Sequence, residues 1–202
     1  MQTLSLPAPL REEFATVEIL WHSTAKTRFA DALILSWTKY EKQLRRLFCF
    51  LVFQHPEIKE ANINEVIASL AESRDLYPQT FIEGIEQLGV ASVPTLLASR
   101  YAELWQEVAR IQKYRNKLIH GQITGSDIKS VQLKHDILWI VDWISCLATA
   151  ADNTFGYDGL ERNTYRTAKA AKKIAVNKYP FNAPADLKGW LSKLTGRKRR
   201  TG

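Results

Sequence analysis

The chain has 202 residues, of which 46% are hydrophobic and 24% charged, a composition typical of a globular protein with one core and room for an appendage. Its most apolar segment, residues 44–53, contains Arg45 and Arg46 and is too short to span a bilayer. The first residues also lack the basic start and apolar run of a secretory signal. We therefore expect a cytoplasmic protein without a membrane partner. Cys49 and Cys146 lie in apolar helical patterns, which indicates reduced core thiols rather than a disulfide framework.

The net charge of +7 is unevenly distributed. Residues 160–202 hold 12 lysines and arginines against two acids, a net of +10, whereas residues 1–159 have a net charge of −3. This asymmetry indicates contact with a polyanion, and nucleic acid, either RNA or DNA, is the candidate. Four cations of a tail predicted to be disordered are candidates for contacting its phosphates: Arg197, Lys198, Arg199 and Arg200. The alternative is a solvated tail that only aids solubility.

Hydrophobic periodicity predicts helices and no strands. The first helix spans about residues 11–22. The second begins after a cap at Ser23 or Thr24 and runs to about residue 53. Its last turns are apolar almost all round, so we expect them to be deeply buried or to meet another chain. Two short helices are predicted at about residues 65–74 and 80–88, and the fold class is an all-α, up-and-down bundle of four or five helices.

A long helix is predicted to begin near Val93, with an apolar stripe at Val93, Leu97, Tyr101, Leu104, Val108, Ile111 and Leu118. Arg115 interrupts this stripe. A guanidinium there is costly unless it is paired or points into a wet cleft. Asn116 and His120 are four residues apart and share a neighbouring line of the helix. Gly121 supplies the left-handed turn that ends it. An arginine, an asparagine and a histidine are thus gathered at one helix end.

A strongly apolar helix follows at about residues 127–151, with a stripe that includes Ile128, Val131, Leu138, Val141, Ile144 and Leu147. Turn residues after 152 mark a boundary, so we divide the chain into a helical bundle, residues 1–155, and a basic helical extension with the tail, residues 156–202. In the extension we expect a surface helix at 160–177 and a short helix at 185–194, capped by Asn182, whose Trp190 docks back on the body. Four tryptophans on apolar stripes are expected in the core: Trp37, Trp105, Trp139 and Trp143.

The sequence from Arg115 to His120, followed by Gly121-Gln122, resembles the Arg-x4–6-His signature of HEPN domains, in which a polar residue often follows the arginine. The helix around residues 40–48 also resembles the opening HEPN helix. The resemblance covers roughly residues 25–152. It implies a small helical bundle that acts as a dimeric, metal-independent endoribonuclease of toxin or defence type, with Arg115 and His120 as the catalytic pair and Asn116 as an assisting residue.

The resemblance implies attack of a ribose 2′-hydroxyl on the adjacent phosphorus. His120 would transfer a proton as a general acid or base, and Arg115 would stabilise charge on the phosphate. Lys117 is a further candidate for RNA contact. Five residues separate Arg115 and His120, which places them about 140° apart around one helix. Either the helix ends between them, or a second copy completes the site, as the resemblance implies for a homodimer.

No CxxC, HExxH, EF-hand loop or glycine-rich phosphate loop is present, so we expect no metal and no cofactor. Other functions stay open. The chain is alternatively a catalytically inactive HEPN module that binds RNA or nucleotide, an adaptor paired with a nucleotidyltransferase, or a purely structural helical adaptor; an antitoxin is a further partner to consider. A transcription regulator would need a helix-turn-helix, which the basic extension lacks. In the structural alternative, Arg115 pairs with an acid of the first long helix and His120 binds the last carbonyls of its own helix.

Overall fold

The computed structural model describes residues 4–73, 76–123, 127–160, 164–170, 174–176 and 180–196. Within these ranges all regular elements are helices and no strand occurs, which confirms the all-α prediction. The α-helices are α1 (Arg11–His22), α2 (Arg28–Gln54), α3 (Ile63–Glu72), α4 (Pro78–Gln87), α5 (Val93–Leu97), α6 (Tyr101–Ile119), α7 (Ser130–Phe155), α8 (Thr164–Ala170) and α9 (Leu187–Leu194). Short 3-10 turns lie at Ala8–Leu10, Glu60–Asn62, Ala98–Arg100 and Pro184–Asp186. No helix in the described part of the chain is both long and apolar enough to cross a membrane.

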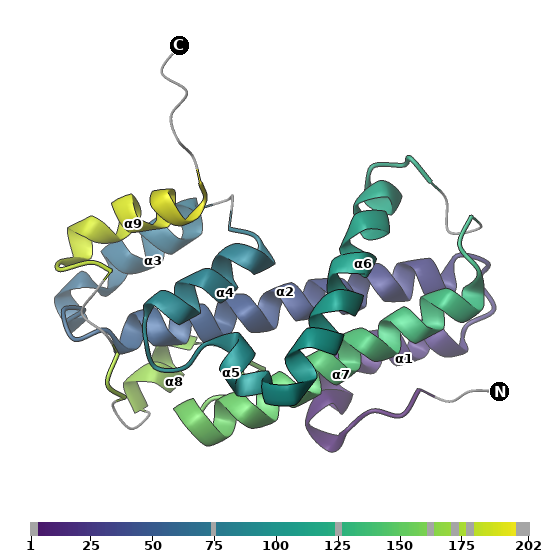
Figure 1. Cartoon of the computed structure of the whole chain (residues 1–202), viewed down its shortest axis with the longest axis horizontal. Coiled ribbons are helices and arrows are strands. Elements are labelled where there is room, and N and C mark those ends of the chain that lie inside the picture. The colour runs from purple at the N-terminus through teal and green to yellow at the C-terminus, as the bar shows by residue number, and fades with distance from the viewer. Residues whose placement is uncertain are drawn as a thin grey trace, which may run out of the picture.

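The central element is α2, which runs along the long axis of the molecule and packs against α1, α4, α7 and α8 (Figure 1). Apolar residues recur on it at helical spacing, and its buried side chains include Phe29, Leu33, Trp37, Tyr40, Leu44, Leu47, Phe48 and Leu51. Trp37 and Trp143 are buried as predicted, whereas Trp105 and Trp139 pack against the core with part of their surface exposed. A single apolar core therefore surrounds α2.

The apolar end of α2 is covered by the chain itself. Phe48 lies against Phe81 of α4 and Trp190 of α9, with ring centroids 5.6 Å and 5.5 Å away. Phe50 stacks on Tyr157 at 4.7 Å. Of the two expectations for this end, deep burial is confirmed, and these turns do not form a surface for a second chain.

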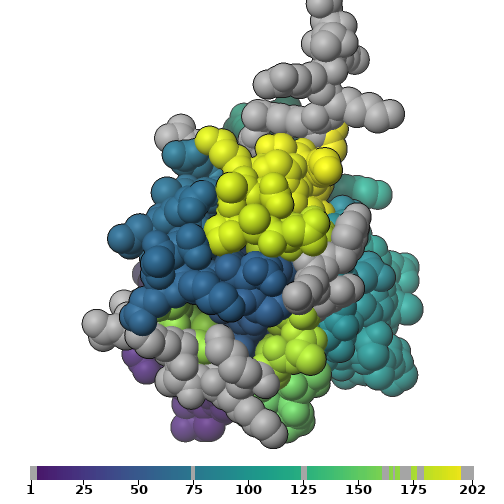
Figure 2. Space-filling model, turned by 90° about the vertical axis from the view of Figure 1, so that its left-hand side faces the viewer, coloured from purple at the N-terminus to yellow at the C-terminus, as the bar shows by residue number. Residues whose placement is uncertain are grey.

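The C-terminal segment shares this core. Trp190 is buried, and its Nε1 donates to the side-chain oxygen of Gln87 at 2.8 Å, so its predicted docking is confirmed. Figure 2 shows α9, in yellow, against the blue segment that contains α3. Gln54 of α2 donates to the carbonyl of Ala168 in α8 at 2.7 Å. The division at residue 155 stays a prediction about independent folding, since buried side chains on both sides of it join one core.

Several predicted boundaries are wrong. The second helix begins at Arg28, after Thr27, because residues 23–27 form a turn. Of the helix predicted at 160–177, the described residues form α8 (Thr164–Ala170), whereas Leu160 and residues 174–176 lie outside any helix. Asp186, rather than Asn182, precedes α9, and its carboxylate accepts from the Ala183 amide at 3.2 Å.

The predicted long helix from Val93 is broken at Ala98. This residue has φ +47°, and it separates α5 from the 3-10 turn that leads into α6. Neither glycine nor proline marks the break, and the apolar spacing continues across it. The break lets Val93 and Leu97 stay buried against the neighbouring helices while α6 leaves in another direction. In Figure 1, α6 crosses α2 and its C-terminal turns extend beyond that helix.

Candidate active site

The motif occupies the last turns of α6 and its cap. His120 is the C-cap residue, and Gly121 has φ +64°. The Gln122 amide donates to the Lys117 carbonyl at 2.9 Å, and the Gly121 amide donates to the Leu118 carbonyl at 3.2 Å. These are the two bonds of a Schellman motif. The prediction that Gly121 ends the helix in a left-handed turn is confirmed.

Arg115 faces the body of the protein and contacts α2. Its Nη2 lies 3.3 Å and 3.5 Å from the two carboxylate oxygens of Glu41. Its guanidinium carbon lies 5.4 Å from the ring centroid of Trp37, and Trp37 Nε1 donates to Glu41 Oε1 at 2.6 Å. The Arg115 side chain is only 21% exposed. A cation occupies the apolar stripe because a carboxylate and an aromatic face compensate for its desolvation.

Asn116 lies beside Arg115, and its Oδ1 accepts a hydrogen bond from Arg115 Nη1 at 3.0 Å. A guanidinium has five N–H donors. One hydrogen of Nη1 is therefore directed to Asn116. The Nε of Arg115 is buried and makes no hydrogen bond within the described part of the chain. The structure thus brings two of the three predicted catalytic residues together.

His120 lies apart from this pair. Its side chain is exposed, and no hydrogen bond or ion pair among the described residues joins it to Arg115 or Asn116. The backbone amide of His120 donates to the Asn116 carbonyl at 3.0 Å, the last α-helical bond of α6. Arg115 points to α2 and His120 to solvent, as the angle of about 140° between them requires. One chain alone does not aim both side chains at one point.

The sequence predicted Trp37 only as a core residue, and it predicted an acid of the same helix as the partner of a structural Arg115 without identifying Glu41. The available signal was their i, i+4 spacing on one helix face, which allows the indole N–H to reach the carboxylate. That they meet Arg115 depends on how α6 crosses α2. No local pattern records this crossing.

A second polar cluster, which was not predicted from the sequence, joins α6 to α7 by hydrogen bonds. Asp136 of α7 is fully buried and accepts hydrogen bonds from Arg110 Nη2 at 2.5 Å, from Gln132 Nε2 at 2.8 Å and from the Tyr114 hydroxyl. Burial raises the pKa of the Asp136 carboxyl, and Arg110 opposes this effect. The sequence feature that could have indicated this cluster is an acid on the buried face of α7. The predicted stripe instead included Val131, which is 64% exposed.

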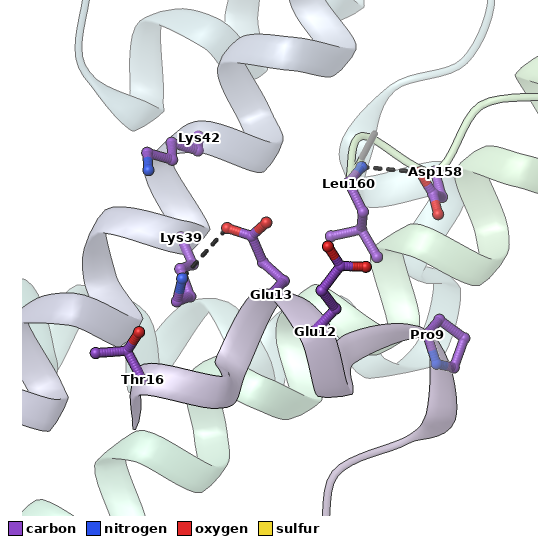
Figure 3. Close-up of a pocket in the computed structure, with 8 residues that line it drawn as sticks. All are labelled: Pro9, Glu12, Glu13, Thr16, Lys39, Lys42, Asp158 and Leu160. Atoms are coloured by element: carbon purple, nitrogen blue, oxygen red, sulfur yellow. Dashed lines mark hydrogen bonds and ion pairs between the residues drawn. The ribbon is translucent and has the colours of Figure 1, made fainter. Parts of the chain in front are cut away.

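A pocket of about 640 Å³ lies elsewhere in the described part of the chain. It is bounded by α1, α2 and residues 158–160 (Figure 3). Among its lining residues Glu13 lies 3.3 Å from Lys39 Nζ, and Asp158 accepts from the Leu160 amide at 2.8 Å. No residue of the motif lines this pocket. The motif instead lies at the end of α6, where Asn116, Lys117 and His120 are exposed.

Neither thiol nor metal chemistry is indicated in the described residues. No three side chains of His, Cys, Asp or Glu within them are grouped so as to hold a metal ion. Cys49 and Cys146 are free, as predicted. Burial raises the pKa of both thiols, that of Cys49 to about 11, so neither is an activated nucleophile.

Of the predicted RNA contacts, Lys117 is exposed beside the motif. Arg197, Lys198, Arg199 and Arg200 lie outside the described residues. In comparisons with known proteins, no family model, no curated protein and no solved structure matches this chain.

Proposed function

We propose that the protein is a metal-independent endoribonuclease whose active site forms between two copies of the chain. The observation that supports this most directly is the environment of the Arg115 side chain. It is kept charged and oriented on an apolar stripe by Glu41 and Trp37, with Asn116 attached to it and a general acid–base residue, His120, a little more than one turn away.

In the proposed reaction the ribose 2′-oxygen attacks the adjacent phosphorus while the bond to the 5′-oxygen breaks. The products are a 2′,3′-cyclic phosphate and a 5′-hydroxyl, so no water and no redox partner is consumed. His120 removes the proton from the attacking hydroxyl or returns one to the leaving oxygen. Arg115 stabilises the charge that builds on the nonbridging oxygens, and Asn116 holds the guanidinium in place.

In this proposal a second copy of the chain brings an arginine and a histidine of the motif to the same point. The two side chains leave α6 in different directions, so His120 of one protomer would meet Arg115 of the other across a two-fold axis. An exposed apolar side chain within the motif supports such a contact. Ile119 is 46% exposed. Apolar surface of this kind beside a polar motif favours association.

The competing function is a catalytically inactive module that binds RNA or nucleotide, alone or beside a nucleotidyltransferase. One observation favours it. Arg115 already has a carboxylate partner within its own chain, which is what a structural arginine requires.

The deciding experiment incubates purified protein with a mixed-sequence RNA in the presence of EDTA, and compares it with His120→Ala. The proposal expects cleavage that the chelator leaves unchanged, products with cyclic phosphate ends, and a 10²–10⁴-fold loss of rate in the variant. If a folded His120→Ala protein cleaves at the wild-type rate, the binding module becomes the better account.

A further inference from the structure

The segment that carries the motif has a positive net charge, whereas the rest of residues 1–159 has a negative net charge. Residues 108–134 contain six lysines and arginines and a single acid, a net charge of +5, whereas the remainder of residues 1–159 has a net charge of −8. A charge count over the whole body conceals this contrast. The six cations are Arg110, Lys113, Arg115, Lys117, Lys129 and Lys134.

These cations fall into two groups. Arg110 and Arg115 are neutralised by Asp136 and Glu41, at 2.5 Å and 3.3 Å. Lys113 and Lys117, by contrast, are exposed and form no ion pair within the described part of the chain. Lys188, by comparison, pairs with Glu72 at 2.9 Å. The positive charge of the C-terminal half of α6 is therefore left uncompensated.

Both free lysines share one face of α6 with the motif. At 100° per residue, Lys113, Asn116, Lys117 and His120 lie within a sector of about 100°, away from the residues that face the core. All four are exposed. The helical rise spreads them over about 10 Å along the axis. We name these four residues the α6 cationic face. It lies on the C-terminal half of α6.

We infer that the α6 cationic face binds the sugar–phosphate backbone of single-stranded RNA and leads it to His120. This inference rests on the proposed function for the identity of the polyanion. The face carries lysines, an amide and an imidazole, the groups that contact phosphates without reading bases. It has no aromatic or large aliphatic anchor, which an acidic protein partner would need at the centre of its interface. A length of about 10 Å suits a few successive phosphates of one strand, whereas duplex-binding domains span about 16 base pairs.

The test is a binding titration with a labelled single-stranded RNA whose riboses are 2′-O-methylated, so that attack by the 2′-oxygen is blocked. Fluorescence anisotropy is measured over a range of salt concentrations for the wild type, for Lys113→Gln/Lys117→Gln and for the control Lys42→Gln/Lys59→Gln. Each double change removes two exposed lysines and the same net charge. Circular dichroism melting establishes that all are folded.

We expect the α6 pair to lower affinity on the order of tenfold and to flatten the log–log salt slope by about 1.4, since each phosphate contact contributes about 0.7. The control should change neither, and Lys113→Arg/Lys117→Arg should keep the wild-type slope. Equal effects of both glutamine pairs, or no effect of either, would overturn the inference. Cleavage of unmodified RNA is assayed separately. Binding that depends on these lysines, without cleavage, would contradict the proposed nuclease function and support RNA binding by the α6 cationic face. Cleavage with unchanged binding would support the nuclease and contradict RNA binding by this face.

Discussion

The carboxylate of Glu41 and the guanidinium of Arg115 lie 3.3 Å apart although 74 residues separate them in the chain. This contact joins α2 to the motif-bearing end of α6, and it is made against the ring of Trp37. In the proposed reaction Glu41 acts through Arg115, as a positioning residue.

Glu41→Gln therefore tests whether the orientation of Arg115 matters for turnover. The amide can still accept the Trp37 N–H but no longer holds the guanidinium by charge. We expect kcat to fall about tenfold, since small misplacements of catalytic groups are costly, while KM changes little. The control is Glu103→Gln, an exposed acid of α6 paired with Arg100. An unchanged kcat in Glu41→Gln, with a dead Arg115→Ala, would show that Arg115 is oriented by other groups.

Arg115 and His120 should behave as one catalytic unit. Loss of a preorganised charge donor costs on the order of 10²–10³-fold in rate and loss of a general acid or base 10²–10⁴-fold. The double alanine variant should lose much less than the product of the two single effects. Asn116→Ala should be milder, because this side chain bonds the guanidinium and carries no proton. Single-turnover rates measure all four, and fully multiplicative losses would contradict the unit.

Asp136 should dominate the attachment of α6 to α7. Asp136→Ala leaves Gln132 and the Tyr114 hydroxyl without this acceptor and leaves Arg110 with Glu107 alone, so we expect a loss of roughly 2–4 kcal/mol in the free energy of unfolding. The matched control is Asp142→Ala. Asp142 is bonded to Arg100, also at 2.5 Å, but the Asp142 side chain is 38% exposed, so this change should lower the free energy of unfolding by less than about 1 kcal/mol. Urea unfolding measures both. Equal losses would show that the burial of Asp136 is unimportant.

The same carboxyl predicts a pH dependence with a definite sign. Because burial raises the folded-state pKa of Asp136 above its unfolded value, the folded protein binds the proton more tightly. Between these two pKa values stability should fall as pH rises, and it should level off once the carboxyl is ionised in the folded state. Asp136→Asn cannot titrate at this position. The difference in unfolding free energy between wild type and Asp136→Asn, followed upward from about pH 4, should therefore change in favour of the variant; a constant difference would contradict the shift.

Association through the end of α6 should depend on Ile119. Light scattering is expected to give about twice the chain mass of 23.1 kDa. Ile119→Asp places a charge at the proposed contact, so it should yield monomers and abolish cleavage while leaving the fold intact. Ile19→Asp is the matched control, because Ile19 of α1 is 69% exposed and lies outside the motif. A monomeric wild type that cleaves RNA would remove the shared site.

Local patterns were sufficient for several features. The apolar spacing predicted a helix at residues 11–22, and the structure has α1 at Arg11–His22. Gly121 ends α6 as expected, because a left-handed residue is required where the Schellman bonds close. The mismatch of Arg115 with its apolar stripe also pointed correctly to a charged contact. These features depend on helical periodicity and turn chemistry, which act over a few residues and can be read along the chain.

The remaining features depend on how distant segments pack. Residue 98 is an alanine rather than a glycine or proline, yet the chain turns there. The turn lets α5 and α6 diverge, and Val93 and Leu97 stay buried because of this divergence. Only the crossing of α6 over α2 selects Glu41 as the partner of Arg115, and only the contact of α6 with α7 buries Asp136. The sequence by itself determined that a cation would need compensation; the tertiary structure decided which carboxylate supplies it, since ion pairs form between side chains that folding brings within a few ångströms.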